Sequence, residues 1–155
     1  MQTKTKKILL LLSILSFFVL PVRAALTKHD PLIAAIIHVE SGGNDMAIGD
    51  RGKHEMAYGA LQIRKPCVDD VNRRFGTKYQ AKDMLGNRAL SVWVCQKYIE
   101  TYAAPKWLGR EPTLEDKARI WNGGPSGWKK ASTNGYWAKV QKAMTRNEML
   151  AAAVK

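Results

Sequence analysis

The sequence predicts a single, mostly helical domain with a short hairpin or loop near its beginning. Apolar residues recur with helical spacing in several segments. These segments begin at residues that cap helices and stop at glycine or proline. After the loop that follows Glu40, no segment has a convincing strand pattern. The chain has 155 residues, a length that suits one domain with its own core.

Residues 1–24 have the features of an export signal that is removed from the mature protein. Lysines near the start precede an apolar run of 13 residues, Ile8 to Leu20, which is too short to span a bilayer comfortably. Val22 and Ala24 supply small side chains at −3 and −1. We therefore expect cleavage after Ala24 and a periplasmic or secreted domain of residues 25–155. An uncleaved membrane anchor is the alternative.

The exported part of the chain is strongly basic. The whole sequence carries a net charge of +12, and the signal contains four basic residues and no acidic one, so residues 25–155 keep +8. A secreted protein with this charge is expected to associate with a polyanion, such as a bacterial wall polymer, nucleic acid or anionic lipid. The charges are scattered and form no arginine-rich run, so we expect no nucleic acid partner.

The first helix is predicted from Asp30 to Glu40. Asp30 is a favourable N-cap, and Pro31 fits the first helical position. Three isoleucines, at positions 33, 36 and 37, share a face with Glu40 because their spacing is i, i+3, i+4, i+7. A carboxyl group at the inner end of an apolar helix has a raised pKa, as a general acid near neutral pH requires. The alternative is that Glu40 turns to the surface and accepts a nearby N–H.

The segment after Gly42 and Gly43 is rich in glycine and charge, which predicts a loop or a short hairpin. It contains Asp50 among three further carboxylates. Gln62 stands near the end of the apolar run from Ala57 to Ile63. An amide in this position either faces a cleft or caps its own loop.

Two further helices are predicted in the middle of the chain. The first extends from Pro66 to about Phe75, with an apolar face of Val68, Val71 and Phe75, and Gly76 ends it. A linker follows to Gly86. The second begins at the cap Asn87 and extends to about Ala103. Its broad apolar stripe consists of Leu90, Trp93, Val94, Tyr98, Ile99 and Tyr102.

The end of the chain is predicted to contain a short helix and a longer one. Residues 105–112 form a loop. Thr113 caps the short helix, with Asp116 completing a capping box, and Trp121 stands at its end. A turn of sequence N-G-G-P-S-G follows. The last helix starts near Asn134 or Tyr136 and extends towards Ala152.

Paired carboxylates make glycoside cleavage the first hypothesis for the site. Glycosidases combine one protonated acid with one ionised carboxylate. Glu40 has the apolar setting of the acid, and Asp50, in the polar loop, has the setting of the partner. Aromatic rings, which suit sugar faces, occur around the Gly-Gly-Pro turn; each alone is equally explained as core. These rings are Trp121, Trp128, Tyr136 and Trp137.

Metal and thiol chemistry are weaker hypotheses. His38 and Glu40 followed by Cys67 resemble a zinc deaminase pattern, but Asp70 stands where that pattern needs a second cysteine. We expect no metal and no cofactor. Cys67 and Cys95 in an exported chain predict one disulfide, which argues against a nucleophilic thiol. The alternative is two separate buried thiols.

Three motifs in order resemble the lysozyme superfamily, in particular bacterial lytic transglycosylase (SLT) domains and invertebrate-type lysozymes. Glu40–Gly43 is similar to the Glu-Ser motif that closes the catalytic helix. Tyr58–Ile63 is similar to the G-x-x-Q-I motif of the cleft wall. Ala118–Pro125 resembles the alanine-to-N-x-G motif of transglycosylases and, more closely, the R-x-H-N-G-G-P stretch of the lysozymes. Tyr136-Trp137 and Val140 extend that second match, so the resemblance covers nearly all of the exported chain.

The resemblance implies a lysozyme-like α+β fold and a glycosidase that cuts the MurNAc-GlcNAc β-1,4 bond of peptidoglycan glycan strands. Glu40 takes the role of general acid and then base, and Asp50 lies where invertebrate-type lysozymes carry a second acid. The implied substrate-binding set is Ser41, which would also support Glu40, with Tyr58, Gln62, Trp121, Asn122 and Tyr136. Two departures stand out: Trp121 replaces a histidine of those lysozymes, and most of their cysteines are absent.

Two alternatives remain open from the sequence. A lytic transglycosylase would need only Glu40 and would leave 1,6-anhydro-muramyl products. A non-catalytic wall-binding module would keep the fold and the basic charge without needing Glu40. We expect a monomer, and a secretion-system or phage-type partner stays open.

Overall fold

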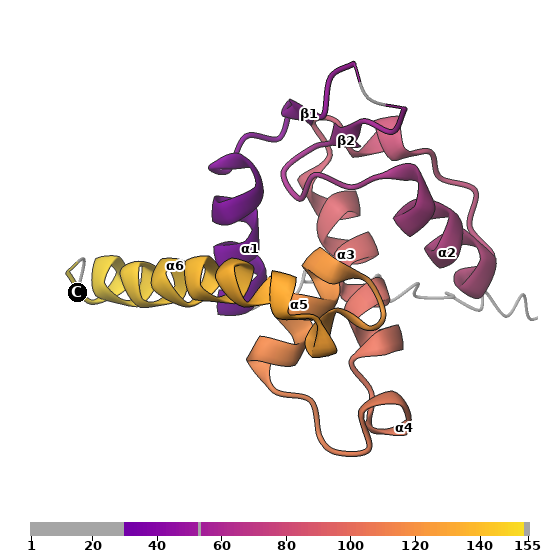
Figure 1. The fold of residues 1–155 in the computed structure, drawn as a ribbon. Coiled ribbons are helices and arrows are strands. Elements are labelled where there is room, and N and C mark those ends of the chain that lie inside the picture. The colour runs from indigo at the N-terminus through magenta and orange to yellow at the C-terminus, as the bar shows by residue number, and fades with distance from the viewer. Residues whose placement is uncertain (1–29, 53, 154–155) are drawn as a thin grey trace, which may run out of the picture.

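The computed structural model describes residues 30–52 and 54–153, with side chains placed through Asn147. The predicted export signal and its cleavage site lie outside these residues. Figure 1 shows a mostly helical molecule with one small antiparallel sheet, which confirms the predicted fold class. The α-helices are α1 (Pro31–Ser41), α2 (Lys65–Phe75), α3 (Arg88–Tyr102), α4 (Pro105–Leu108), α5 (Leu114–Gly123) and α6 (Asn134–Ala153). The remaining elements are the strands β1 (Ile48–Gly49) and β2 (Ala57–Tyr58) and the 3-10 helices η1 (Ala81–Met84), η2 (Gly127–Lys129) and η3 (Ala131–Thr133).

Helix α1 begins and ends as its sequence predicts. The Asp30 carboxylate accepts the Leu32 N–H at 2.9 Å, and Gly42 ends the helix with φ +64°, a left-handed conformation that glycine adopts without strain. The apolar face of α1 is buried and consists of Leu32, Ile33, Ala35, Ile36 and Ile37. Burying each isoleucine stabilises the fold by about 1.5–3 kcal/mol. Helix α6 crosses α1 and covers part of this face (Figure 1).

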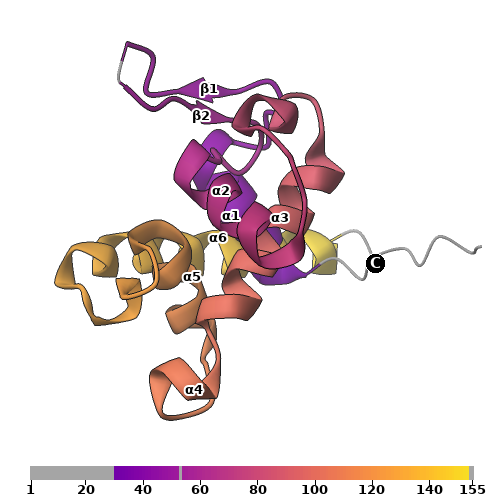
Figure 2. The same ribbon diagram turned by 90° about the vertical axis from the view of Figure 1, so that its right-hand side faces the viewer.

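The hairpin after α1 is short and tightly joined to the rest of the fold. Strands β1 and β2 pair antiparallel, with Ile48 opposite Tyr58, and they project from the top of the molecule in Figure 2. Gly59, next in the chain, has φ +73°, and a Cβ there would come within 2.4 Å of the Met84 carbonyl oxygen. This position therefore requires glycine. Ser41 Oγ donates to the Ala60 carbonyl at 2.8 Å, which fastens the end of α1 to the same loop.

Helices α2 and α3 follow the predicted boundaries, but Phe75 does not belong to the apolar face. Val68 and Val71 are buried as predicted, whereas Phe75 is 42% exposed. It lies in the last turn of α2, where its ring packs edge-on against Trp93 at 6.0 Å, with the Lys97 ammonium over its face. The last turn of α2 therefore lies outside the hydrophobic core.

The later elements match the predictions except at residues 105–112. The expected loop contains α4, a single helical turn that starts at Pro105, where a proline at the first position is favourable. Helix α5 has the predicted capping box: Thr113 Oγ1 accepts the Asp116 N–H at 3.2 Å, and the Asp116 carboxylate accepts the Thr113 N–H at 2.8 Å. The Arg110 guanidinium also binds Asp116. Hydrogen bonding to Arg110, mainly, lowers the pKa of this carboxyl to about 2.

Candidate active site

Glu40 lies in the last turn of α1 and faces a cleft of about 500 Å³. The end of α1, the β1–β2 hairpin, the start of α2, part of α3 and the end of α5 form the walls of this cleft. Its lining residues are Glu40, Gly49, Asp50, Ala57, Gln62, Ile63, Arg64, Cys67, Tyr98, Trp121 and Asn122. All three sequence motifs therefore contribute residues to one cleft.

Two aromatic side chains hold the Glu40 carboxyl group. The Tyr136 hydroxyl of α6 donates to Glu40 Oε1 at 2.7 Å, and the side chain of Trp121, at the end of α5, also hydrogen-bonds Glu40. Burial raises the pKa of Tyr136 far above its usual range, so its hydroxyl stays protonated and remains a donor. The predicted substrate contact Tyr136 is thus a direct partner of Glu40.

The pKa of Glu40 is raised above its ordinary value of 4.5. Burial is the dominant cause, because removal of water disfavours the ionised form. The hydrogen bonds from Tyr136 and Trp121, and the charge of Arg64, act in the opposite direction and do not cancel it. Glu40 is therefore a half-buried acid beside groups that stabilise its anion.

Asp50 lies in the same cleft and forms an ion pair with Arg64. Its backbone has φ +52° and that of Gln62 has φ +50°, left-handed conformations that are uncommon for residues with side chains. Such strain costs on the order of 1–3 kcal/mol per residue and concentrates at functional sites. Both residues were predicted from the sequence, and both line the cleft.

Gln62 performs both of the tasks that its sequence position allows. Its Nε2 donates to the carbonyl oxygens of Gly59, at 2.9 Å, and Ala47, at 3.3 Å, so the amide caps its own loop. The same side chain lines the cleft. Its Oε1 lies where a Cβ at position 49 would stand, at 2.1 Å, so Gly49 lets this amide enter the site.

The other predicted binding residues divide between the cleft and its supports. Trp121 and Asn122 line the cleft. Ser41 does not: its hydroxyl donates to the carbonyl oxygens of Ala60 and Ile37, so it orients the end of α1. Tyr58 is half-buried in the hairpin, where its main chain pairs with Ile48 and bridges to Ile63, and it is not among the lining residues.

Several lining residues were missed from the sequence. Tyr98 was placed only in the apolar stripe of α3; in the structure its ring packs edge-on against Trp121, with centroids 6.0 Å apart. Arg64 directly follows the G-x-x-Q-I motif, which was the available signal, and in the structure it pairs with Asp50. Gly49 gave no signal, because its importance depends on the approach of Gln62 across the hairpin.

The predicted disulfide is not formed in the structure. Cys67 and Cys95 are both free thiols, the first half-buried and the second fully buried in the core. Burial raises the pKa of Cys67 to about 12 and raises that of Cys95 well above its ordinary value, so neither thiol is a ready nucleophile. The prediction rested on the expected compartment, whereas the packing around each cysteine is that of an ordinary apolar side chain.

The described part of the chain, residues 30–52 and 54–153, contains no group of three or more His, Cys, Asp or Glu side chains arranged to hold a metal ion. In the same part of the chain, no helix combines the length and hydropathy that a membrane crossing needs.

Comparison with known proteins shows that the chain is similar to lysozymes. No family model matches the chain. A lysozyme of Meretrix lusoria is 51% identical over 111 residues, which are 71% of this chain and 85% of that protein.

The solved structures that resemble this chain are also lysozymes. The structure of Meretrix lusoria lysozyme in complex with Aeromonas hydrophila PliI matches with a TM-score of 0.61 and 32% identity, and inhibitor-bound Meretrix lusoria lysozyme with 0.62 and 30%. Each match covers 73% of this chain and 88% of the other. Tapes japonica lysozyme, at 24% identity and a TM-score of 0.61, supports the fold alone.

Proposed function

The chain belongs to the lysozyme family, and from this premise we propose that it is a muramidase that hydrolyses the MurNAc-GlcNAc β-1,4 bond of peptidoglycan with Glu40 as general acid. The observation that carries the proposal is the state of Glu40: a half-buried carboxyl group with a raised pKa, which lines a cleft and accepts a hydrogen bond from Tyr136. The homology to Meretrix lusoria lysozyme supports the substrate class.

The surroundings of Glu40 suit both halves of acid–base catalysis. Protonated Glu40 gives its proton to the glycosidic oxygen as the bond to the sugar carbon breaks. The resulting carboxylate is stabilised by the hydrogen bonds from Tyr136 and Trp121. It then accepts a proton from the attacking water, which restores the acid for the next cycle.

We assign the second carboxylate to Asp50. A glycosidase stabilises an oxocarbenium-like transition state with an ionised carboxylate, either as nucleophile or by its charge. Asp50 lines the cleft with Glu40, and the Arg64 guanidinium beside it stabilises a carboxylate. Its left-handed backbone conformation is held at a cost to the fold, as expected for a functional position.

Amide and aromatic groups complete the proposed saccharide site. Gln62 and Asn122 line the cleft. The Gln62 Nε2 already donates to two carbonyl oxygens of its own loop, so this residue offers the acceptor Oε1 to a sugar N–H or hydroxyl. The Asn122 amide offers a donor and an acceptor, which complement an N-acetyl group. The rings of Trp121 and Tyr98, packed edge to face, offer flat surfaces for the apolar faces of sugar rings.

Zymography on purified peptidoglycan tests the proposal, with the exported chain compared with Glu40→Gln and with Asp50→Asn. We expect clearing by the wild type and a loss of about 10²–10⁴-fold for Glu40→Gln with its circular dichroism unchanged. Normal cleavage by Glu40→Gln contradicts the proposal. Binding without cleavage by the wild type identifies a wall-binding module instead.

The products separate hydrolysis from lytic transglycosylation. Mass spectrometry of the released muropeptides should show reducing ends, which are heavier by one water than 1,6-anhydro ends. Asp50→Asn should then cripple the reaction. Anhydro ends from the wild type, together with full activity of Asp50→Asn, would establish a transglycosylase in which Glu40 acts alone.

We also propose that the protein works outside the cytoplasm, because of the signal-like segment before Ala25. Amino-terminal sequencing of exported material should begin at Ala25. A chain that begins at Met1 and stays with the membrane fraction contradicts cleavage.

A further inference from the structure

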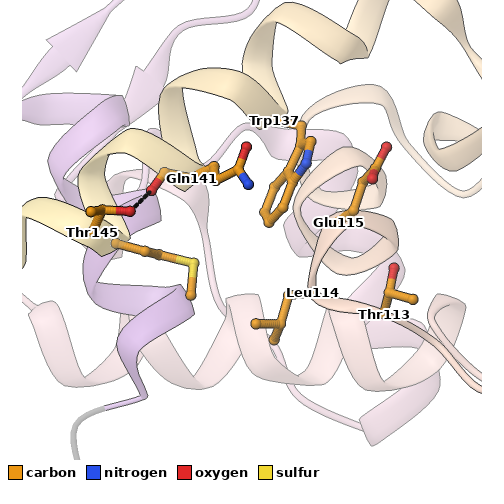
Figure 3. A pocket seen from close by; sticks show the side chains of 7 residues that line it. Thr113, Leu114, Glu115, Trp137, Gln141 and Thr145 are labelled. Atoms are coloured by element: carbon orange, nitrogen blue, oxygen red, sulfur yellow. Dashed lines mark hydrogen bonds between the residues drawn. The ribbon is translucent and has the colours of Figure 1, made fainter. Parts of the chain in front are cut away.

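A second pocket lies between the start of α5 and α6 (Figure 3). Its volume is about 480 Å³, within the range of about 300–1,000 Å³ that is usual for small-molecule sites. Its lining residues are Thr113, Leu114, Glu115, Trp137, Gln141, Met144 and Thr145. None of these residues lines the cleft of Glu40.

The two sites share both helices but use different parts of them. Trp121 lies seven residues after Leu114 in α5, which is about 10 Å along the helix axis. In α6, Tyr136 contacts Glu40, whereas its neighbour Trp137 lines the second pocket. Consecutive helical side chains diverge by about 100°, so these two aromatic residues serve two separate sites.

The lining combines a flat aromatic ring with hydrogen-bonding groups that have no task in the fold. Figure 3 shows Trp137 and Gln141 of α6 around the same opening as Leu114 and Glu115 of α5. Among the described residues, no hydrogen bond uses the Gln141 amide or the Trp137 indole N–H, and no buried side-chain polar atom lacks a partner, so both groups meet solvent. The Leu114 side chain is 44% exposed beside them.

The charge in this pocket favours a neutral ligand. Its one ionisable lining residue, Glu115, forms an ion pair with Arg119 at 2.7 Å. The carboxylate is therefore balanced by its own helix and leaves no unmatched charge for a cationic or anionic ligand. An indole face and an amide beside a neutral space are groups that bind a pyranose ring. The hydroxyl groups of Thr113 and Thr145 are hydrogen-bonded to Asp116 and to the Gln141 carbonyl.

We infer that this pocket is a second saccharide site, which binds an N-acetylhexosamine unit of a glycan strand while the cleft holds the bond to be cut. The Trp137 ring packs against the sugar face, and the Gln141 amide hydrogen-bonds its N-acetyl or hydroxyl groups. The choice of ligand class rests on the proposed function. A polymeric substrate presents many repeats, so a second site retains the enzyme on the wall between cleavages.

Tri-N-acetylchitotriose added to the ¹⁵N-labelled exported chain carrying Glu40→Gln tests the inference without cleavage. The indole N–H signals of Trp121 and Trp137, assigned by single Trp→Phe variants, report the cleft and the second pocket separately. We expect both signals to shift, each with its own binding curve. Gln141→Ala, a change at an exposed position, should weaken the Trp137 curve about three- to tenfold and leave the Trp121 curve unchanged.

Retention on insoluble peptidoglycan gives an independent measurement. Trp137→Ala in the Glu40→Gln chain should lower retention, whereas the matched control Trp107→Ala should not. Trp107 is 53% exposed on α4, with the Lys106 ammonium over its ring, and lines neither site. Thermal unfolding of both variants confirms that they are folded.

The outcomes distinguish this inference from the proposed function. A shift of Trp121 without Trp137 overturns the second site and leaves the cleft in place. A shift of Trp137 without Trp121 supports the second site and contradicts the cleft, and no shift of either overturns both. A binding curve of Trp137 that is unchanged by Gln141→Ala also overturns the inference. A Trp137 signal that shifts with protein concentration alone overturns it too, because a second copy of the chain then fills the pocket.

Discussion

Removing the Tyr136 hydroxyl should shift the pH dependence of the enzyme towards alkaline pH. Tyr136→Phe deletes the donor that lies 2.7 Å from Glu40 Oε1 and keeps the ring. This hydrogen bond favours the ionised form of Glu40, so its loss raises the pKa of the carboxyl further. A general acid is active in its protonated form, below its pKa, so the alkaline limb of the pH–activity profile moves to higher pH.

The size of the shift follows from the strength of the bond. A hydrogen bond to a charged group contributes about 1.5–3 kcal/mol, and one pKa unit corresponds to about 1.4 kcal/mol. Loss of the full bond would thus raise the pKa of Glu40. Water that enters the space left by the hydroxyl recovers part of the bond, so the rise should be smaller than the full strength of the bond would give. Trp121→Phe should act in the same direction and less strongly, because its hydrogen bond is the smaller of the two contributions.

The pH profile of kcat/KM on soluble peptidoglycan fragments measures this shift, since that parameter reports the free enzyme. A ¹³C NMR titration of the Glu40 carboxyl group measures it without catalysis, which makes the result independent of the proposed reaction. An unchanged titration, or a shift to lower pH, would refute the account in which Tyr136 stabilises the Glu40 anion.

Further predictions concern stability. The pKa of Glu40 is higher in the folded state than in the unfolded state, so ionisation of Glu40 opposes folding as the pH rises. In urea unfolding at pH 7, Glu40→Gln should therefore be more stable than the wild type. The difference in stability should vanish below about pH 4.5, where the carboxyl group is protonated in both states. Asp116, with a pKa of about 2 against 3.8, stabilises the fold above pH 4 by about 2 kcal/mol, and this advantage over Asp116→Asn should disappear between pH 4 and 2. Gly59→Ala should lower the free energy of unfolding by more than about 2 kcal/mol, because both the φ of +73° and the nearby Met84 carbonyl disfavour a Cβ. Gly76→Ala, which has φ +68° but open space around the Cβ position, should lower it by about 1 kcal/mol. Alkylation after unfolding without reductant should label both cysteines; an unlabelled pair with a mass lower by two hydrogens would show the disulfide instead.

The helices were predictable from the sequence because their signals are local. The caps Asp30, Asn87 and Thr113 act on N–H groups two or three residues away, and all three perform that task in the structure. The position of Glu40 at the inner end of α1 followed in the same way from spacing within one helix. Interactions between residues a few positions apart were therefore enough to predict these helices.

The site itself depended on contacts that no local pattern encodes. The bond from Tyr136 to Glu40 joins residues 96 positions apart, and the sequence indicated only that Tyr136 belonged near sugar. Phe75 has the right spacing for the apolar face of α2, but the core ends before the last turn of that helix. Cys67 and Cys95 are free thiols in the structure, and their pairing stays a prediction that the alkylation experiment tests, because an expected compartment says nothing about how two side chains pack.

The burial that builds the core also tunes the candidate catalytic acid. The isoleucines of α1 place Glu40 among apolar neighbours, which stabilises the fold through the helix and destabilises the ionised carboxylate at its end. A charged Glu40 is tolerated because Tyr136 and Trp121 supply hydrogen bonds from α6 and α5. The packing of α6 across α1 is therefore required for the chemistry as well as for the core. It follows that changes in the α1–α6 contact far from the cleft should alter the pKa of Glu40 before they unfold the protein.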